Sequence, residues 1–306
     1  MNESGTASSP LVVVTGANGF VGSRTCEALV ERGATVRAVV RRHGTAPPLP
    51  GVEERVGAFY DPDVARAVVA GASAVVTTVH PMGTGRETQH RTAVEGTPIL
   101  VRAARDAGVE RLVHISTAAV YDRSPWVGDV DEQSALVDDD ADVYAVTKRD
   151  TDLALAEVDG ITRVLVRPPA VLGPGETSIW NSLRPASMRE NEHARRVFAP
   201  QTFAWVHVDD LTALVADVAV CRVATSSDPD SGPVPGGCTV VNAPAGSVAA
   251  RYYYETVTGA LGVQPVWTDG PAWTGRMLAR RAQRWGWAPT VDLPSALAEI
   301  EEGLRG

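Results

Sequence analysis

The first half of the chain alternates short apolar runs, rich in β-branched residues, with longer stretches in which apolar and polar positions recur at helical spacing. Uninterrupted apolar runs are typical of strands that are buried on both faces of a parallel sheet. The longer stretches are typical of the amphipathic helices that connect such strands. The pattern therefore predicts βαβ units on a parallel sheet.

The predicted elements follow one another at short intervals. Strands are predicted over Leu11 to Thr15, Thr35 to Val40, Val52 to Val56, Ala74 to Val79, Arg111 to Ser116 and Thr162 to Val166. Helices are predicted over Gly19 to Arg32 and near residues 62–70, 88–107 and 140–158. This order predicts an α/β fold with a doubly wound, parallel Rossmann-type sheet.

The alternation weakens after Arg167, where prolines and glycines crowd together. The Pro- and Gly-rich segment Ser226 to Gly237 is typical of a surface loop. Further elements are expected over Ala204 to Val220 (a strand and a helix), Thr239 to Asn242 (a strand), and near 247–261 and 294–304 (helices). We divide the chain into a Rossmann domain and a smaller substrate-binding lobe. The domain comprises residues 1–170 with return elements at about 204–243, and the lobe comprises 171–203 and 244–306.

Composition narrows the class of protein. The chain has 306 residues, with 28 basic and 37 acidic side chains and a formal net charge of −9. This balance argues against a nucleic-acid partner, because phosphate binding needs a basic face. Three cysteines without C-x-x-C spacing indicate neither disulfides nor a zinc site, so no metal is expected. No signal sequence or membrane-spanning run is apparent, so we expect a cytoplasmic protein.

A glycine-rich turn, TGANGFVG, directly follows the first predicted strand. Glycines between a strand and a helix let the backbone approach a pyrophosphate, and the helix N-terminus supplies free N–H groups. The predicted cofactor-binding residues of this turn are Gly16, Asn18, Gly19, Phe20 and Gly22. A tight turn without a ligand is the alternative interpretation.

Two arginines, Arg41 and Arg42, end the second predicted strand. Many dinucleotide folds have an acidic residue there, which binds the ribose 2′-hydroxyl, whereas an arginine can receive a 2′-phosphate. The sequence therefore favours NADP(H), with NAD(H) as the alternative. The alternative interpretation is a pair of surface arginines without a ligand, because nearly all basic residues of this chain are arginines and its only lysine is Lys148.

That lysine lies four residues after Tyr144 in a predicted helix, so both side chains share one face. An ammonium near a phenol lowers the pKa of the tyrosine and makes it a usable proton donor near neutral pH. Thr117 ends a predicted strand at the edge where ligands bind in α/β sheets, and its hydroxyl can donate to a carbonyl oxygen. An exposed helical pair and a simple strand-end cap are the alternatives.

These residues resemble the short-chain dehydrogenase/reductase superfamily, specifically its extended branch of NAD(P)-dependent epimerases, dehydratases and ketoreductases. The similar segments are TGANGFVG, HISTAAVYD at 114–122, YAVTK, RPPAVLGPG at 167–175, WVHVDDL at 205–211 and GWAPTVDL at 286–293. The resemblance implies that Tyr144 is the general acid, that Lys148 holds the nicotinamide ribose and tunes Tyr144, and that Thr117 orients the substrate carbonyl. It also implies that Pro168 lies over the nicotinamide and that the protein forms a homodimer.

The chain departs from the branch at several positions. Ala118 and Ala119 stand where sugar-nucleotide dehydratases carry an Asp-Glu pair, which argues against a 4,6-dehydratase. Phe203 replaces an arginine that grips a diphosphate in many sugar-nucleotide members, and Ala58 and Ala93 replace an adenine-contacting Asp and a proton-relay Asn. Four lobe arginines are possible substitutes for the lost diphosphate contact: Arg184, Arg189, Arg195 and Arg196.

The loop that starts at His80 should border the nicotinamide, so His80 is a candidate for assisting proton transfer, with a structural role as the alternative. The C-terminal part is rich in aromatic side chains, for which core packing is expected and a pocket for a flat substrate is the alternative. These aromatic residues are Tyr252, Tyr253, Tyr254, Trp267, Trp273, Trp285 and Trp287.

The leading hypothesis is an NADPH-dependent ketoreductase that acts on a small-molecule carbonyl compound. A nucleotide-linked 4-keto-deoxysugar is the first substrate class to test, and a polyketide-type ketone is the second. The alternatives are a sugar epimerase with tightly held NAD and a non-catalytic NADP-binding sensor protein.

Overall fold

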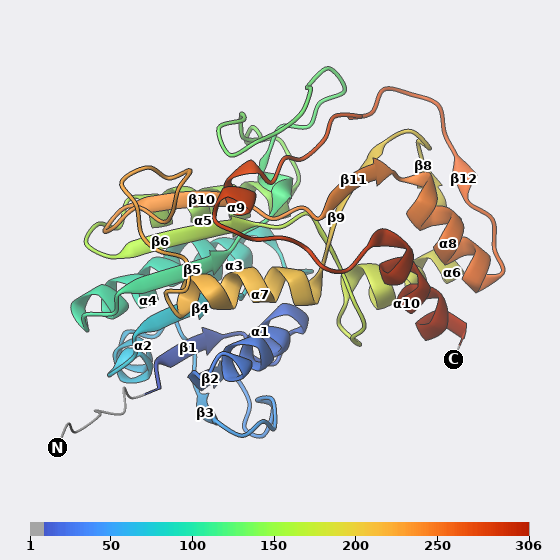
Figure 1. Cartoon of the computed structure of the whole chain (residues 1–306). Coiled ribbons are helices and arrows are strands. Elements are labelled where there is room, and N and C mark those ends of the chain that lie inside the picture. Colours follow the sequence, from blue (N-terminus) through green and yellow to red (C-terminus); the bar gives the residue numbers. More distant parts are fainter. Residues whose placement is uncertain (1–8, 306) are drawn as a thin grey trace.

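A seven-stranded sheet forms the centre of the protein in the computed structural model, which describes residues 9–305 (Figure 1). Its strand order is β10-β6-β5-β4-β1-β2-β3, and all neighbouring pairs are parallel. The strands are β1 (Leu11–Thr15), β2 (Thr35–Val40), β3 (Val52–Val56), β4 (Ala74–Thr77), β5 (Arg111–Ile115), β6 (Thr162–Arg167) and β10 (Cys238–Asn242). The order reverses between β1 and β4, which confirms the predicted doubly wound fold.

Helices cover both faces of this sheet, because alternate strand residues are apolar on each side. Val12 and Val14 belong to the core on one face, whereas Val13 belongs to the core on the other. The first face is covered by α1 (Phe20–Glu31), α7 (Val208–Ala219) and α9 (Arg280–Arg284). The second is covered by α2 (Pro62–Val69), α4 (Gly96–Asp106) and α5 (Val143–Ala156).

The helix predicted near 88–107 is interrupted. A short helix, α3 (Arg86–Gln89), continues into a π-helical turn, η1 (His90–Glu95), before α4 begins. Such π turns are frequent at functional sites. Ala93 is buried in this turn, which contacts α5, the helix that contains Tyr144.

The segments predicted to form a substrate-binding lobe, called the lobe below, lie beside the carboxyl end of the sheet (Figure 1). Its strands are β7 (Ala170–Leu172), β8 (Arg196–Val197), β9 (Thr202–His207), β11 (Gly246–Ala249) and β12 (Val266–Trp267). Its helical elements are η3 (Ile179–Leu183), α6 (Arg184–Glu190), η4 (Glu192–Arg195), α8 (Arg251–Leu261) and α10 (Leu293–Arg305). Strands β11, β9 and β7 form one small sheet, and β12 and β8 form another.

Two expectations about the second half differ from the structure. The helix predicted near 247–261 begins only at Arg251, because Gly246–Ala249 pair with β9 as strand β11. Strand β9 joins the lobe sheet, so α7 and β10, but not β9, return to the Rossmann domain. Short strands in small sheets have few residues with which to display an alternating pattern.

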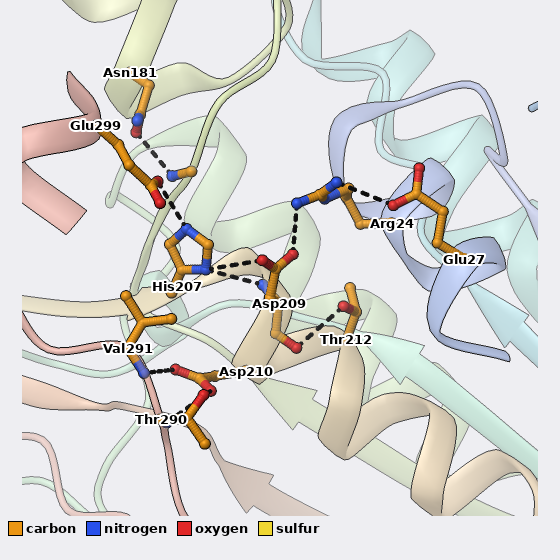
Figure 2. Close-up of polar contacts among 11 residues, drawn as sticks. Arg24, Glu27, Asn181, His207, Asp209, Asp210, Thr212, Thr290, Val291 and Glu299 are labelled. Carbon is orange, nitrogen blue, oxygen red and sulfur yellow. Dashed lines mark hydrogen bonds and ion pairs between the residues drawn. The ribbon is translucent and has the colours of Figure 1, made fainter. Parts of the chain in front are cut away.

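A polar cluster around the start of α7 joins the lobe to the Rossmann domain (Figure 2). His207 Nε2 donates to Glu299 Oε2 of α10 at 3.0 Å. On the other side, Arg24 Nη2 of α1 donates to Asp209 Oδ1 at 2.7 Å. These contacts connect α10 to α1 through the N-terminal turn of α7.

Asp210, the next residue of α7, fixes the C-terminal segment (Figure 2). Its buried carboxylate accepts hydrogen bonds from the backbone N–H groups of Thr290 at 2.8 Å and Val291 at 3.1 Å. Trp287 Nε1 donates to the Asp210 carbonyl oxygen at 2.9 Å. The segments WVHVDDL and GWAPTVDL, which resemble family landmarks, are therefore in direct contact.

No helix among residues 9–305 is long and apolar enough to cross a membrane.

Candidate functional site

The glycine-rich turn between β1 and α1 requires glycine for steric reasons. Gly16 has a φ of +71°, which other residues rarely adopt, and a Cβ on Gly22 would lie 2.1 Å from the Gly16 carbonyl oxygen. Gly19 is the N-cap of α1, which has neither a side-chain cap nor an acidic residue in its first turn. The N–H groups of this helix end are therefore available to an anion, and the turn fits a cofactor pyrophosphate.

The other predicted residues of the turn lie on different sides of it. Asn18 is exposed, whereas Phe20 lines a cavity at the carboxyl end of the sheet. A Cβ on Gly175 would lie 2.9 Å from the Phe20 ring, so the loop over residues 167–175 packs against the cofactor turn.

Arg41 and Arg42 are exposed in the bend that follows β2, and neither forms an ion pair within residues 9–305. The backbone of this bend is held by Glu54 Oε1 and Oε2, which accept hydrogen bonds from the N–H groups of Gly44, Thr45 and Ala46 at 2.9 to 3.1 Å. These bonds lower the pKa of Glu54, with His43 contributing, so the carboxylate stays ionised as the anchor of the loop. The two guanidinium groups remain free to bind an anion.

A cavity of about 360 Å³ lies where β4, β5 and β6 end. Most of the predicted catalytic and nicotinamide-side residues line it: Phe20, His80, Thr117, Tyr144, Lys148 and Pro168. The glycines of the turn and the two arginines after β2 do not, as expected for residues that would contact the distant pyrophosphate and ribose of a dinucleotide. The site thus unites residues spread over the first 170 positions.

Tyr144 enters the cavity from the first turn of α5. Asp142 caps this helix, because its side chain accepts a hydrogen bond from the Tyr144 N–H at 2.9 Å. Burial raises the pKa of Tyr144, while the Thr117 hydroxyl lowers it and the charges of Asp152 and Asp142 raise it. The direction is opposite to the lowering expected from the sequence, because the desolvation of the phenolate is the largest effect on the pKa of Tyr144. Tyr144 is therefore a neutral phenol near pH 7.

Thr117 is placed by the turn that follows β5. Its hydroxyl oxygen caps this turn, η2 (Ala118–Val120), and accepts a hydrogen bond from the Ala119 N–H at 3.2 Å. The hydroxyl nonetheless lines the cavity with Tyr144. The predicted cap and the predicted contact with a ligand are compatible, because the oxygen accepts from the backbone and its hydrogen stays available to donate.

Lys148 is 3% exposed and lies one helical turn beyond Tyr144. Its Nζ donates to the Ile115 carbonyl oxygen at 2.6 Å. Burial lowers the pKa of Lys148 to about 8, and the charge of Asp152 opposes this shift. An ammonium with one backbone acceptor keeps two further N–H donors for a ligand in the cavity.

Asp152, which the sequence analysis overlooked, lies beneath the cavity one turn after Lys148. Its carboxylate accepts hydrogen bonds from Ser116 Oγ at 2.8 Å and Arg167 Nε at 2.9 Å. Burial raises the pKa of Asp152, while Arg167, Ser116 and Lys148 lower it. The spacing of four residues from Tyr144 to Lys148 and again to Asp152 was a signal that could have identified it.

His80 lies beside Tyr144, with the two ring centroids 4.9 Å apart and the rings edge to face. Its Nε2 is 2.9 Å from Gln89 Oε1, which also accepts from the Thr147 hydroxyl at 3.1 Å. Burial, followed by the charge of Lys148, lowers the pKa of His80 to about 4. The imidazole is therefore neutral near pH 7, and its buried Nδ1 has no partner among the described residues.

Other cavity residues were also missed. Trp180 from the lobe, Met82 from the loop after β4 and Arg123 from the loop after η2 line the cavity. Of the predicted aromatic residues, Tyr253, Tyr254, Trp273 and Trp287 are buried in cores, as packing predicts, whereas Tyr252 and Trp267 are exposed.

Phe203 stacks on Tyr253 with ring centroids 4.9 Å apart. None of the four lobe arginines that could replace the lost diphosphate contact lines the cavity.

Comparison with known proteins finds relatives of this chain both by sequence and by fold. The chain is 32% identical over 177 residues to the 4-hydroxy-2-methyl-3-oxo-4-farnesyl-3,4-dihydroquinoline-1-oxide ketoreductase of Stigmatella aurantiaca. This alignment covers 56% of this chain and 53% of that protein. It is also 32% identical over 174 residues to the 2-alkyl-3-oxoalkanoate reductase of Stenotrophomonas maltophilia, covering 55% and 53%. The chain thus spans about half the length of these curated relatives.

Solved structures share the whole fold. A short-chain dehydrogenase/reductase superfamily protein from Agrobacterium tumefaciens with bound NAD has a TM-score of 0.77 at 20% identity, covering 96% of this chain and 97% of that one. The UDP-glucose 4-epimerase of Thermotoga maritima has a TM-score of 0.75 at 18% identity, covering 96% and 98%. The sequence model of the NAD dependent epimerase/dehydratase family matches residues 12–225. The chain therefore belongs to the NAD dependent epimerase/dehydratase family.

Proposed function

We propose that this protein is an NADP(H)-dependent ketoreductase that reduces a substrate ketone to an alcohol. The observation that carries the proposal is a neutral phenol, Tyr144, beside the Thr117 hydroxyl, with Ala118 and Ala119 where a dehydratase would need a second acid and base. A neutral phenol is the form that donates a proton, as carbonyl reduction requires.

The free helix end after the glycine turn would hold the pyrophosphate, and Lys148 would hold the nicotinamide ribose. When bound, a reduced nicotinamide cofactor supplies a hydride to the carbonyl carbon. Tyr144 donates its proton to the carbonyl oxygen, and Thr117 donates a hydrogen bond to the same oxygen. Water returns a proton to Tyr144 after the reaction. Asp152 lies beneath Lys148 and favours its charged form.

Several observations favour a ketone with an apolar body over a nucleotide-linked sugar. Phe203 is part of the lobe core, so the side chain at that position cannot bind a diphosphate. Phe20, Met82 and Trp180 give the cavity apolar walls. The two relatives above are named as reductases of a quinoline-type ketone and of an oxoalkanoate. We therefore place the polyketide-type ketone ahead of the 4-keto-deoxysugar.

The test is turnover of a panel of cyclic and open-chain ketones by the purified protein with NADPH and with NADH. The proposal expects cofactor oxidation with at least one ketone and little cofactor retained after purification. Stoichiometric retained NAD together with sugar epimerisation would instead support the epimerase alternative. Absence of turnover across the panel would leave the sensor alternative as the better account.

Cofactor choice is predicted to depend on Arg41 and Arg42. Replacing both with alanine should raise the KM for NADPH by about 10- to 100-fold and change the KM for NADH less than about twofold, because only NADPH carries the 2′-phosphate. Steady-state kinetics with both cofactors measures this. Arg66→Ala, on the exposed part of α2, is the matched control. Equal changes for the two cofactors would refute an NADP preference based on these residues.

The pH dependence of the reaction is predicted to lack a histidine step. Because the pKa of His80 is about 4, the ring keeps its neutral form as the pH falls from 8 to 5. Over this range kcat/KM should show no inflection near pH 6.5, where a solvated histidine titrates. His80→Asn should leave the profile's shape unchanged. A wild-type inflection near 6.5 that disappears in His80→Asn would assign His80 a proton-transfer role.

A further inference from the structure

Arg123 lies at the wall of the cavity and has no counter-ion among residues 9–305. It lies in the loop after η2, six residues beyond Thr117, and lines the same cavity as Thr117 and Tyr144. Among the described residues, no carboxylate lies within 4.0 Å of its nitrogens, and its N–H groups have no hydrogen-bond acceptor. Its guanidinium carbon is 5.7 Å from the centroid of the Trp273 ring.

The platform under Arg123 is fixed independently of it. Trp273 is 5% exposed, and its Nε1 donates to the Gly128 carbonyl oxygen at 2.9 Å. Its own carbonyl oxygen accepts from the Thr202 N–H at 2.9 Å. A Cβ on Gly275 would lie 2.1 Å from the Gly128 oxygen, so the two backbones are in close contact. Trp273 therefore does not need Arg123 to hold its place, and the ring presents a rigid face for a cation.

The charges around the cavity are strongly one-sided. The residues that line it include two basic side chains, Arg123 and Lys148, and no aspartate or glutamate. The nearest buried carboxylate, Asp152, is engaged by Ser116 and Arg167. This contrasts with the chain as a whole, whose formal net charge is −9. A positive cavity in an acidic protein favours entry of an anion.

Arg123 also occupies a concave position. Its side chain is exposed to solvent, yet the surrounding protein lowers its pKa through desolvation. Arg123 therefore lines the cavity while remaining accessible to solvent. Interactions between charges are stronger in such a place than on an open surface.

We propose that Arg123 binds the carboxylate of the ketone substrate, so that the protein reduces keto acids. The proposal rests on the ketoreductase function above and names its substrate class. A guanidinium presents paired N–H donors that match a carboxylate. A guanidinium that already packs on an aromatic ring loses little side-chain conformational entropy when it binds a ligand. Bound in this way, the carboxylate lies at Arg123, the ketone lies at Thr117 and Tyr144, and the hydrocarbon part contacts the apolar walls.

The test compares benzoylacetate with its ethyl ester, which share the ketone and the ring but differ in charge. Wild-type kcat/KM should favour the acid by about 10- to 100-fold, as one charge-assisted hydrogen-bonded pair predicts. Arg123→Gln should remove most of this preference through a higher KM for the acid and leave the ester within about twofold. Arg123→Lys should retain part of it, and Arg189→Gln, exposed on α6, should change neither substrate. Equal use of both substrates by the wild type, or equal losses in Arg123→Gln, would overturn the proposal.

A binding measurement keeps this test separate from the reductase proposal. Calorimetric titration of the cofactor-loaded protein with benzoate and with benzamide should give tighter binding of benzoate, and Arg123→Gln should abolish the difference. If no ketone is reduced but this difference is found, the ketoreductase proposal fails and the anion site stands. If benzoate and benzamide bind the wild type equally, the anion site is refuted whatever the activity.

Discussion

Replacing Tyr144 with phenylalanine is expected to lower kcat for ketone reduction by about 10²- to 10⁴-fold. The Tyr144 phenol lines the cavity as a neutral acid together with the Thr117 hydroxyl. Phenylalanine keeps the ring, so its contact with His80 and the fold of α5 should be preserved. The rate of the chemical step is measured in single-turnover experiments that follow the absorbance of the reduced nicotinamide. The affinity for the cofactor should change less than about threefold.

Tyr252→Phe is the control for this substitution. Tyr252 is 52% exposed on α8 and lies outside the cavity, so loss of its hydroxyl should leave both kcat and cofactor affinity unchanged. A Tyr144→Phe variant that keeps wild-type kcat would show that the proton comes from another group. In that event Lys148, Thr117 and His80, which also line the cavity, would be the next groups to test as the donor.

Replacing Lys148 with arginine is expected to lower kcat/KM by about 100-fold or more, although the charge is retained. Lys148 is almost fully buried, and its Nζ is held at 2.6 Å from the Ile115 oxygen. A planar guanidinium is larger than an ammonium and cannot occupy the same position without displacing its neighbours. Steady-state kinetics and the Kd for NADPH by fluorescence measure the effect, and thermal unfolding checks that the variant is folded.

Lys148→Met separates shape from charge, because methionine fills similar space without an ammonium. Since the pKa of Lys148 is lowered to about 8, the wild type loses this charge as the pH rises through 8 in the cofactor-free protein. NADPH affinity of the wild type should therefore weaken above pH 8, whereas that of Lys148→Met should be weak at every pH. An Lys148→Arg variant with full activity and affinity would contradict the role given to this lysine.

Most of the central sheet could be predicted from sequence because its inner strands are buried on both faces. The predicted bounds of β1, β2 and β3 agree with the structure, although β3 (VEERV) is an edge strand without a buried residue. Strands β7, β8, β11 and β12 were missed, because they have two to four residues each and, unlike the equally short β4, no continuous buried run. Their pairing partners are distant in sequence, and a run of this length has no periodicity to detect.

The residues of the candidate site likewise fall into those that local sequence patterns predict and those that they do not. The glycine turn and the pair Tyr144 and Lys148 depend on local spacing, which the sequence displays directly. Arg123 and Trp180 depend on which distant segments surround them, so no local pattern identified them. The pKa of Tyr144 moved opposite to the expectation, because the spacing predicted the nearby cation but not the extent of burial.

The wall behind Arg123 is made of two segments far apart in the chain, because Trp273 reaches the backbone of Gly128 across 145 positions. The side chains that line the cavity itself all lie between Phe20 and Trp180. During synthesis the ribosome therefore completes the proton-transfer residues well before the tryptophan that supports the substrate's anion contact. A chain that ends before Trp273 would contain every side chain that lines the cavity but would lack the ring that supports the proposed anion contact.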